Sequence, residues 1–303
     1  MGSKQSTKKT NIPVPSFGSD FNALFTLNKN VDNNVIAVGT GSFSCVFLCS
    51  RTGRYAQQCA VKHFDLETLH KGVEQNEIDS KQLELSLNRT RRGLQVLMNY
   101  SGHQSFIQLL NIFDQPPNFL CSVMEYADGG ELYDYITTRV QLQQDEAQEI
   151  LIHITKGVSF LHQMGSVHRD IKPENICKVG NVWKLCDFGF ARDFEDGNDN
   201  MNTLCGTKGY AAPEMFLGKD KDYSGKAIDV YSLGVVAYFM MGGYLPFKDG
   251  GAVVIFHIER WQTVTEIAKN FIKETLLHNP LDRLKSSELM THEFLAGKDT
   301  TKK

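Results

Sequence analysis

The fold of this chain is decided by His168-Arg169-Asp170-Ile171-Lys172-Pro173-Glu174-Asn175, with Asp187-Phe188-Gly189 beginning twelve residues after Asn175. Asp170 offers a carboxylate that can accept a hydroxyl proton, and Asn175 and Asp187 offer the oxygen ligands that Mg²⁺ prefers. Either motif alone could arise by chance in a soluble protein. In this order and at this distance, the pair predicts a site that handles phosphate groups and a divalent cation.

A second phosphate-handling element is predicted upstream, between two β-rich runs. Gly39-Thr40-Gly41-Ser42-Phe43-Ser44-Cys45-Val46 contains glycines that let a backbone approach phosphate oxygens closely, with Ser44 where a third glycine would stand. Lys62 follows Val46 by sixteen residues and supplies a point charge for phosphates. The loop alone is weak support, and the loop together with Lys62 predicts a nucleotide site.

Composition narrows the class of protein. The 303 residues suit one large enzyme domain or two lobes, and a net charge of -3 argues against a nucleic-acid partner. The seven cysteines show no paired spacing, which argues against a zinc site or a disulfide framework. No apolar run approaches the roughly 18 residues that span a bilayer. We therefore expect a reduced, cytoplasmic protein.

The first residues carry a different signal. Met1-Gly2-Ser3-Lys4-Gln5-Ser6 fits the pattern that exposes Gly2 for myristoylation. One acyl chain binds membranes only weakly, and Lys4, Lys8 and Lys9 would add attraction to anionic lipid. The alternative is a polar, flexible tail that happens to begin Met-Gly. Peripheral membrane contact through Gly2 and a plain tail both stay open.

The distribution of apolar residues predicts an α+β fold with a β-rich part followed by a helical part. Antiparallel strands are expected at 35–38, 46–48, 59–61, 106–110 and 119–124. Residues 74–100 predict one long helix, or a loop leading into a shorter one, and helical periodicity dominates beyond Asp128-Gly129-Gly130. We predict a flexible tail (1–30), a small antiparallel β lobe with one helix (31–127), a larger mainly α-helical lobe (128–296) and a short C-terminal tail (297–303).

With these motifs in order, residues 31–296 resemble the eukaryotic protein kinase family. Ala212-Pro213-Glu214 resembles the motif that closes the family's activation segment, and Asp229-Val230-Tyr231-Ser232-Leu233-Gly234 resembles its buried central helix. The resemblance implies that 168–175 is the catalytic loop, that Asp229 braces it and that Arg283 pairs with Glu214. It also implies a two-lobed fold that uses ATP and Mg²⁺, with Mn²⁺ as an alternative metal.

The same resemblance implies the role of each site residue. Asp170 would accept the hydroxyl proton, Lys172 would contact the transferring phosphate as in serine/threonine kinases, and Lys62 would position phosphates. Asn175 and Asp187 would hold the metal. The nucleotide would contact Val38, Gly39, Gly41, Ser44, Val46, Ala60, Lys62, Met124, Glu125, Ala127 and Glu131. Gly129-Gly130-Glu131-Leu132 is most similar to the calmodulin-dependent kinase-like group.

An activation site is implied by Thr203-Leu204-Cys205-Gly206-Thr207, which is identical as a string to the activation segment of cyclic-AMP-dependent protein kinase. Thr203 would be the phosphate acceptor for an upstream activating kinase, and Thr207 would orient Asp170 and Lys172. A phosphate beside Arg169 would form charge-assisted hydrogen bonds that order a loop. In the alternative, Thr203 is a solvated loop residue and nearby acids hold Arg169 unaided. Those acids are Asp193, Glu195, Asp196 and Asp199.

Substrate recognition follows from the resemblance as well. Glu131 and Glu174 are implied to meet basic side chains, with Thr207 supporting the peptide site, so protein substrates with basic serine or threonine sites are expected. The acid that cyclic-AMP-dependent kinase carries on a later helix falls here at Phe239. We therefore expect selection for arginine at position -3 more than at -2.

One departure from the family bears on activity. The helix glutamate that should pair with Lys62 falls at Gly93, 31 residues further on. Glu84 lies nine residues upstream, on the opposite face of a helix, and Glu77 is no better placed.

Two hypotheses follow from Gly93: an active protein kinase, or a nucleotide-binding pseudokinase or scaffold. The retained Asp170, Asn175, Asp187 and Lys62 favour the enzyme. A small-molecule kinase is disfavoured, because Ala212-Pro213-Glu214 and Thr207 resemble activation segments that bind peptides.

Overall fold

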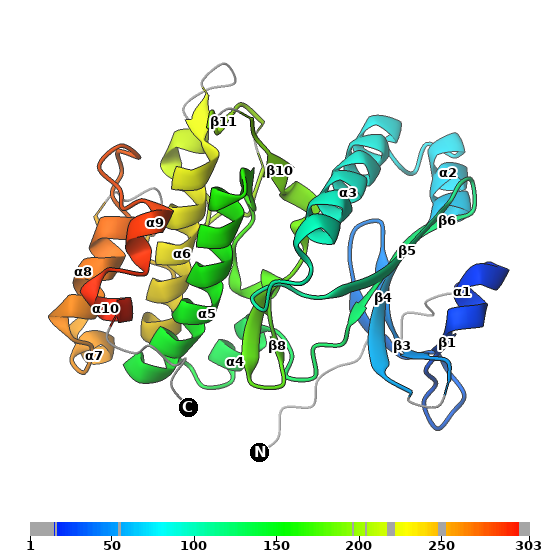
Figure 1. Ribbon diagram of the computed structural model, residues 1–303, viewed down its shortest axis with the longest axis horizontal. Helices are drawn as coiled ribbons and strands as arrows, with labels where there is room; N and C mark the ends of the chain where they lie inside the picture. The colour runs from blue at the N-terminus through cyan, green and yellow to red at the C-terminus, as the bar shows by residue number, and fades with distance from the viewer. Residues whose placement is uncertain are drawn as a thin grey trace. The chain divides into compact units, whose positions relative to one another are not determined.

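The computed structural model in Figure 1 describes residues 15, 17–53, 56–195, 197–203, 205–216, 222–247 and 253–296. The chain divides into two compact units. The N-terminal unit contains residues up to 83 together with 109–126, and the C-terminal unit contains 84–108 and everything from 127 onward. Residues 84–108, which the sequence placed in the β lobe, therefore group with the helical unit.

The N-terminal unit is built on a six-stranded antiparallel sheet. Its order is β1-β3-β4-β6-β5, with β2 paired to β3. The strands are β1 (Phe25–Leu27), β2 (Ala37–Thr40), β3 (Cys45–Arg51), β4 (Gln58–Asp65), β5 (Leu109–Gln115) and β6 (Phe119–Glu125). Helix α1 (Ser19–Leu24) precedes β1, and α2 (Leu66–Glu74) contacts β4 and β6. The sequence missed β1 and started β5 three residues early.

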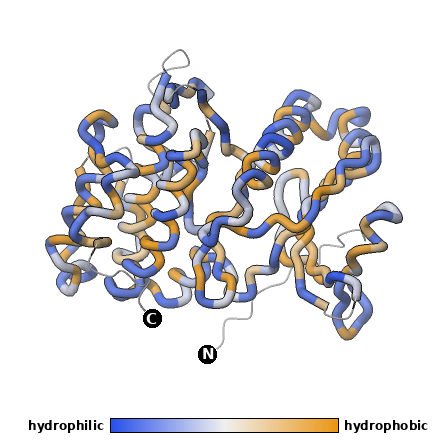
Figure 2. The backbone as a smooth tube through the Cα atoms, in the orientation of Figure 1, coloured by the Kyte–Doolittle hydropathy of each residue, from blue (hydrophilic) through white to orange (hydrophobic). Residues whose placement is uncertain are grey.

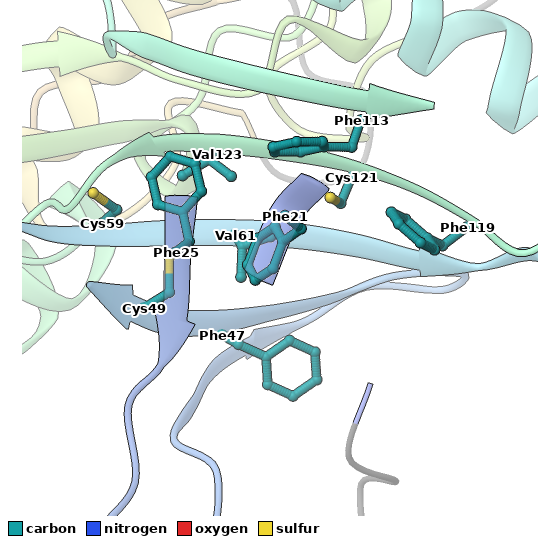
Figure 3. Packing of buried hydrophobic residues seen from close by; sticks show 10 residues of the cluster. All are labelled: Phe21, Phe25, Phe47, Cys49, Cys59, Val61, Phe113, Phe119, Cys121 and Val123. Carbon is teal, nitrogen blue, oxygen red and sulfur yellow. The ribbon is translucent and has the colours of Figure 1, made fainter. Parts of the chain in front are cut away.

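The chain before residue 31 forms part of this core. Phe21 and Phe25 are almost fully buried. They pack with Phe113, Phe119 and three cysteines of the sheet, Cys49, Cys59 and Cys121 (Figure 3). Phe17 stacks on Phe21 with ring centroids 3.8 Å apart. The folded region therefore includes residues 17–30, which the sequence assigned to a tail. Residues 1–14 with Gly2, Lys4, Lys8 and Lys9, and the predicted tail 297–303, lie outside the described residues.

His63 on β4 is held in this aromatic layer. Its ring lies 4.8 Å from Phe17 and 5.7 Å from Phe119, and its Nε2 is buried without a hydrogen-bond partner among the described residues. Burial lowers the pKa of His63 to about 4, against a smaller opposing effect of Asp65. The folded protein therefore keeps His63 neutral.

Because of His63, the free energy of unfolding is expected to decrease as the pH is lowered. The unfolded chain binds a proton near its ordinary pKa of 6.5 and the folded chain only near 4, so the stabilisation is present above 6.5 and is lost as pH falls through this window. We expect His63 to account for a drop of about 2 kcal/mol in the free energy of unfolding between pH 7 and pH 5. Urea unfolding of the protein, His63→Phe and the exposed control His70→Gln would measure this. A His63→Phe protein that keeps the full pH dependence would contradict it.

The C-terminal unit is mainly helical. Its helices are α3 (Ser80–Tyr100, shared with the preceding unit at its first turn), α4 (Leu132–Thr137), α5 (Gln144–Gln163), α6 (Gly225–Gly242), α7 (Ile258–Trp261), α8 (Glu266–Thr275), α9 (Ser286–Leu289) and α10 (Glu293–Ala296). Three strand pairs join β7 (Ser166–Val167) to β10 (Arg192–Asp193), β8 (Ile176–Val179) to β9 (Val182–Leu185), and β11 (Asn200–Met201) to β12 (Tyr223–Ser224). The predicted α+β class is confirmed. None of the described helices is long and apolar enough to cross a membrane.

Helix α6 is the centre of this unit. It is hydrophobic along most of its length (Figure 2) and contacts α5 and α8. A helix that is apolar all round must be buried. Asp229 lies within it and is completely inaccessible to solvent, so this carboxylate requires strong internal partners.

Candidate active site

Asp229 holds the loop between β7 and β8 through hydrogen bonds to the loop backbone. Its Oδ1 accepts a hydrogen bond from the Arg169 backbone N–H at 2.7 Å, and its Oδ2 accepts one from His168 N–H at 2.8 Å. His162 Nε2 lies 2.9 Å from Oδ2. Burial would raise the pKa of Asp229, but the contacts with His162 and His168 lower it overall. The predicted brace is confirmed.

Four side chains meet immediately beyond this brace. Thr207 Oγ1 donates to Asp170 Oδ1 at 3.0 Å and accepts from Lys172 Nζ at 2.7 Å. Asn175 Nδ2 donates to Asp170 Oδ2 at 2.8 Å and to the Asp170 carbonyl at 2.9 Å. Lys172 Nζ also lies 3.1 Å from Asp170 Oδ2. Asp170 is therefore a buried carboxylate fixed on both oxygens and kept beside a positive charge.

The β8–β9 hairpin brings the two predicted metal ligands together. The backbone N–H of Cys186, next to Asp187, donates to the Asn175 carbonyl at 2.9 Å. Asp187 is exposed and adopts φ of 51°, and its Oδ1 accepts from Gly189 N–H at 3.2 Å.

These residues fit a hard cation. The Asn175 amide nitrogen makes the two hydrogen bonds to Asp170, so its oxygen is the atom suited to a metal. Within the described ranges, no three His, Cys, Asp or Glu side chains gather to hold a metal ion. Two oxygen ligands are typical of Mg²⁺, which keeps waters and substrate phosphates as its remaining ligands.

The predicted nucleotide residues of the N-terminal unit lie on adjacent strands. Gly41 N–H donates to Ser44 O at 2.7 Å in the turn between β2 and β3. Lys62 on β4 pairs with Val46 on β3, and Ala60 pairs with Met124 on β6. Val38 and Gly39 lie on β2, and Glu125 ends β6. Ala127 and Glu131 belong to the C-terminal unit.

The hydrogen bonds of residues 187–214 show which groups contact Arg169 and which bind elsewhere. Asp193 accepts from Ser166 Oγ at 2.5 Å, and Asp199 accepts from Ser224 Oγ at 2.5 Å and Lys226 N–H at 2.8 Å. Arg169 Nε donates to Phe190 O at 2.8 Å, and its Nη1 is buried without a partner in the described part of the chain. Asp193 and Asp199 therefore bind Ser166, Ser224 and Lys226, and neither makes a hydrogen bond to Arg169 among the described residues. Asp196 lies outside the described residues, and Glu195 stays a predicted alternative partner of Arg169.

The end of this segment is anchored by a buried ion pair. Arg283 Nη1 lies 2.7 Å from Glu214 Oε1, and Arg283 Nη2 lies 3.2 Å from Glu214 Oε2. Arg283 also donates to the carbonyls of Ala227 and Leu277. The predicted pairing of Arg283 with Glu214 is confirmed as a bidentate contact.

Comparison with known proteins shows what this arrangement is similar to. A model of the protein kinase domain matches residues 33–295. The chain belongs to the protein kinase family. A calcium/calmodulin-dependent protein kinase type 1 from Caenorhabditis elegans is 33% identical over 274 residues, covering 86% of this chain and 73% of the relative. The chain falls in the serine/threonine branch, within the calmodulin-dependent kinase-like group.

Two further relatives support the same grouping. A maternal embryonic leucine zipper kinase from Xenopus tropicalis is 33% identical over 270 residues, covering 85% of this chain and 38% of the relative. The phosphorylase b kinase gamma catalytic chain, liver/testis isoform, from Bos taurus is 31% identical over 271 residues, covering 85% of this chain and 64% of the relative. Kinases of this family generally use ATP and Mg²⁺.

Two acids predicted to recognise substrate lie near each other in this kinase. Burial raises the pKa of Glu131, and Asp134 and Glu174 raise it further. Glu174 Oε2 is buried with no hydrogen-bond partner among the described residues. Phe239 is buried and stacks on Tyr133 with ring centroids 6.0 Å apart. The position of the later acid of cyclic-AMP-dependent kinase is therefore apolar here.

The helix that should carry the kinase glutamate is continuous. Residues 75–79 separate α2 from α3, so the predicted alternative of a loop leading into a shorter helix is confirmed, and one helix over 74–100 does not form. Glu77 precedes α3, and Glu84 is exposed near its start. Because α3 has no break at which its register could change, neither acid replaces a glutamate at the buried Gly93.

Sequence reasoning missed Arg89, and it named Asp199 only as a possible partner of Arg169. Asp199 caps the start of α6 through Ser224 and Lys226, and Arg89 on α3 lies over the Phe190 ring with 5.1 Å to its centroid. The only signal for Arg89 was its place one helical turn before Gly93. Both contacts join segments far apart in sequence.

Proposed function

We propose that this protein kinase transfers the γ-phosphoryl group of ATP to serine and threonine hydroxyls of protein substrates. The observation that carries the proposal is the cluster of Asp170, Lys172, Asn175 and Thr207. It holds a carboxylate, an ammonium group and an amide in one hydrogen-bonded arrangement. Phosphoryl transfer needs positioned charges more than covalent chemistry from the protein.

Each residue then has a definite role. Asp170 orients the substrate hydroxyl and accepts its proton, and Lys172 stabilises the charge of the transferring group. Asn175 and Asp187 would hold Mg²⁺, or Mn²⁺ in its place, and the bound metal would neutralise phosphate charge. The role proposed for Lys62 is to position the phosphates.

The remaining nucleotide residues complete this proposal. Gly39, Gly41 and Ser44 would form the phosphate loop. The adenine surface would be provided by Val38, Val46, Ala60 and Met124. The further predicted nucleotide contacts are Glu125, Ala127 and Glu131.

The second candidate function is a nucleotide-binding pseudokinase or scaffold. Gly93 favours it, since the position of the family's helix glutamate has no carboxylate. The intact Asp170 cluster favours the enzyme, because a scaffold would not require a carboxylate fixed on both oxygens.

The substrates we propose are proteins with basic serine or threonine sites. Glu174 Oε2, buried and unpartnered among the described residues, is suited to a guanidinium group, and Glu131 lies close enough to interact with it. A buried carboxylate oxygen without a partner is unfavourable, and a charge-assisted hydrogen bond from a guanidinium group would offset that cost. The apolar Phe239 favours arginine at -3 over -2.

Activation by an upstream kinase at Thr203 completes the proposal. Thr203 is exposed, and its carbonyl accepts a hydrogen bond from Tyr223 Oη at 2.5 Å. Burial raises the pKa of Tyr223 to about 12, while nearby Arg169 lowers it. The guanidinium of Arg169 therefore lies close to the Thr203 segment and keeps donor capacity at Nη1 for a phosphate.

The sequence alone supports a cytoplasmic location. Myristoylation of Gly2, with Lys4, Lys8 and Lys9 attracting anionic lipid, is a further proposal on the same footing.

Transfer of labelled γ-phosphate from Mg²⁺-ATP to a peptide with arginine at -3 is expected from protein phosphorylated at Thr203. Asp187→Ala should abolish transfer, because it removes a metal ligand. Thr203→Ala should lower transfer by about tenfold or more, because the phosphate that orders the segment through Arg169 cannot form.

Mass spectrometry would confirm the state of Thr203, and an otherwise identical peptide with glutamate at -3 is the control for specificity. Nucleotide binding without transfer, in protein phosphorylated at Thr203, would instead establish the scaffold.

A further inference from the structure

Gly93 lies in the interior of α3 and packs directly on the backbone of the metal loop, the residues 187–189 that begin with the predicted metal ligand Asp187. A Cβ built on Gly93 would lie 2.0 Å from the Phe188 carbonyl oxygen, 2.5 Å from its carbonyl carbon and 3.0 Å from Gly189 Cα. All three atoms are backbone atoms, so no side-chain rotation relieves the overlap. Any other residue at 93 would force α3 and the loop at 188–189 apart.

The same helix face makes a second contact with this loop. Arg89, one turn before Gly93, places its guanidinium 5.1 Å from the centroid of Phe190. Residues four apart lie on one side of a helix. Arg89 and Phe190 also line a cavity of about 500 Å³ with Cys205, Gly206, Lys208, Gly209 and Phe216. The face that carries residues 89 and 93 is therefore the face that meets residues 188–190.

The loop touched by Gly93 is itself hydrogen-bonded to the catalytic residues. The Phe188 carbonyl accepts from Ala191 N–H at 2.8 Å, and the Phe190 carbonyl accepts from Arg169 Nε at 2.8 Å. Gly189 N–H donates to Asp187 Oδ1 at 3.2 Å. Displacement of this backbone would move the Asp187 carboxylate.

A glycine in a helix interior lowers the stability of the helix, so its presence there calls for a structural reason. Glycine is a weaker helix former than alanine. The close approach to Phe188 gives the physical reason for a glycine inside a 21-residue helix.

We propose that Gly93 and Arg89 are positioning residues for phosphoryl transfer. They hold α3 against residues 188–190 by backbone contact and by a cation–π contact, and thereby fix Asp187. This inference rests on the proposed function. At position 93 the absence of a side chain allows close backbone packing, and no charged group acts there. Introducing the family's glutamate at this position therefore lowers activity instead of restoring it.

The test compares Gly93→Ala and Gly93→Glu with Gly102→Ala. Gly102 is the matched control, because a Cβ there meets no heavy atom within 4 Å. A displacement of about 1 Å near the chemistry is expected to reduce kcat by about 100-fold in both Gly93 variants. Affinity for Mg²⁺-ADP, measured by titration calorimetry, should fall by about tenfold or more, since Asp187 would be misplaced. Gly102→Ala should match the wild type in both measurements.

A second readout does not depend on transfer. Amide hydrogen exchange in the peptide covering 186–192 should be faster in Gly93→Ala than in Gly102→Ala, with peptides of α6 unchanged. Arg89→Met should speed exchange in the same peptide, and Arg89→Lys should restore part of the protection because it keeps a cation over Phe190. These Arg89 variants keep the inference testable where a Gly93 variant fails to fold.

The outcomes separate this inference from the proposed function. Gly93→Glu with activity and exchange equal to or better than the wild type would overturn the positioning role. A wild type that transfers no phosphate would overturn the proposed function, and Mg²⁺-ADP binding and exchange would still decide the role of Gly93.

Discussion

Asp170→Asn is expected to lower kcat by about 10²–10⁴-fold while the KM for ATP changes little. The substituted amide can still accept the Thr207 hydrogen bond on one oxygen. Its new NH₂ group would face the Asn175 amide nitrogen and the Lys172 ammonium, both of which are donors. The variant therefore loses the proton acceptor and replaces an attraction by a clash of donors.

Steady-state kinetics with the phosphorylated protein would measure this effect. Asp32→Asn, at an exposed position of the N-terminal unit, is the matched control for charge loss. A kcat within tenfold of the wild type would show that another group orients the hydroxyl. Unchanged Mg²⁺-ADP binding in Asp170→Asn would place the loss in the chemical step.

Asp229→Ala is expected to destabilise the protein by about 3–5 kcal/mol. The carboxylate is completely buried and accepts from the backbone of His168 and Arg169 as well as contacting His162. Its removal leaves two backbone N–H groups and an imidazole nitrogen without partners in a dry interior. The catalytic loop would loosen, and kcat would fall together with stability.

Urea unfolding would give the free energy, and Asp229→Asn supplies the graded comparison. Asparagine keeps one acceptor oxygen, so its loss should be smaller than that of alanine. A loss below about 1 kcal/mol for Asp229→Ala, similar to a typical surface substitution, would contradict the bracing role.

The local chemistry of the site was predictable from the sequence. Asp170, Lys172 and Asn175 lie within six consecutive residues, so their meeting depends on one short loop whose conformation is largely local. Even Thr207, which reaches this loop from 35 residues beyond Lys172, was placed correctly because the motif that contains it resembles known activation segments. The buried position of α6 was also predicted, because Asp229-Val230-Tyr231-Ser232-Leu233-Gly234 resembles the family's central helix.

The ends of elements and the long-range partners were less accessible. Phe21 and Phe25 join the core from a stretch that the sequence placed in a tail, because α1 and β1 are too short to produce a periodic pattern. Asp193 and Asp199 looked like free acids beside Arg169, yet each bonds to a hydroxyl far away in the chain. Such pairings depend on distances between segments, which a sequence pattern does not contain.

The sequence by itself determined the family, the chemistry of the residues in the catalytic loop and the α+β class, because motifs and periodicity are local properties of the chain. It also showed that a glycine stands at position 93, where the family's glutamate was expected. Only the tertiary structure decided what that glycine contacts. The overlap of a Cβ with the Phe188 carbonyl exists only because α3 and the metal loop, 95 residues apart between Gly93 and Phe188, pack backbone to backbone.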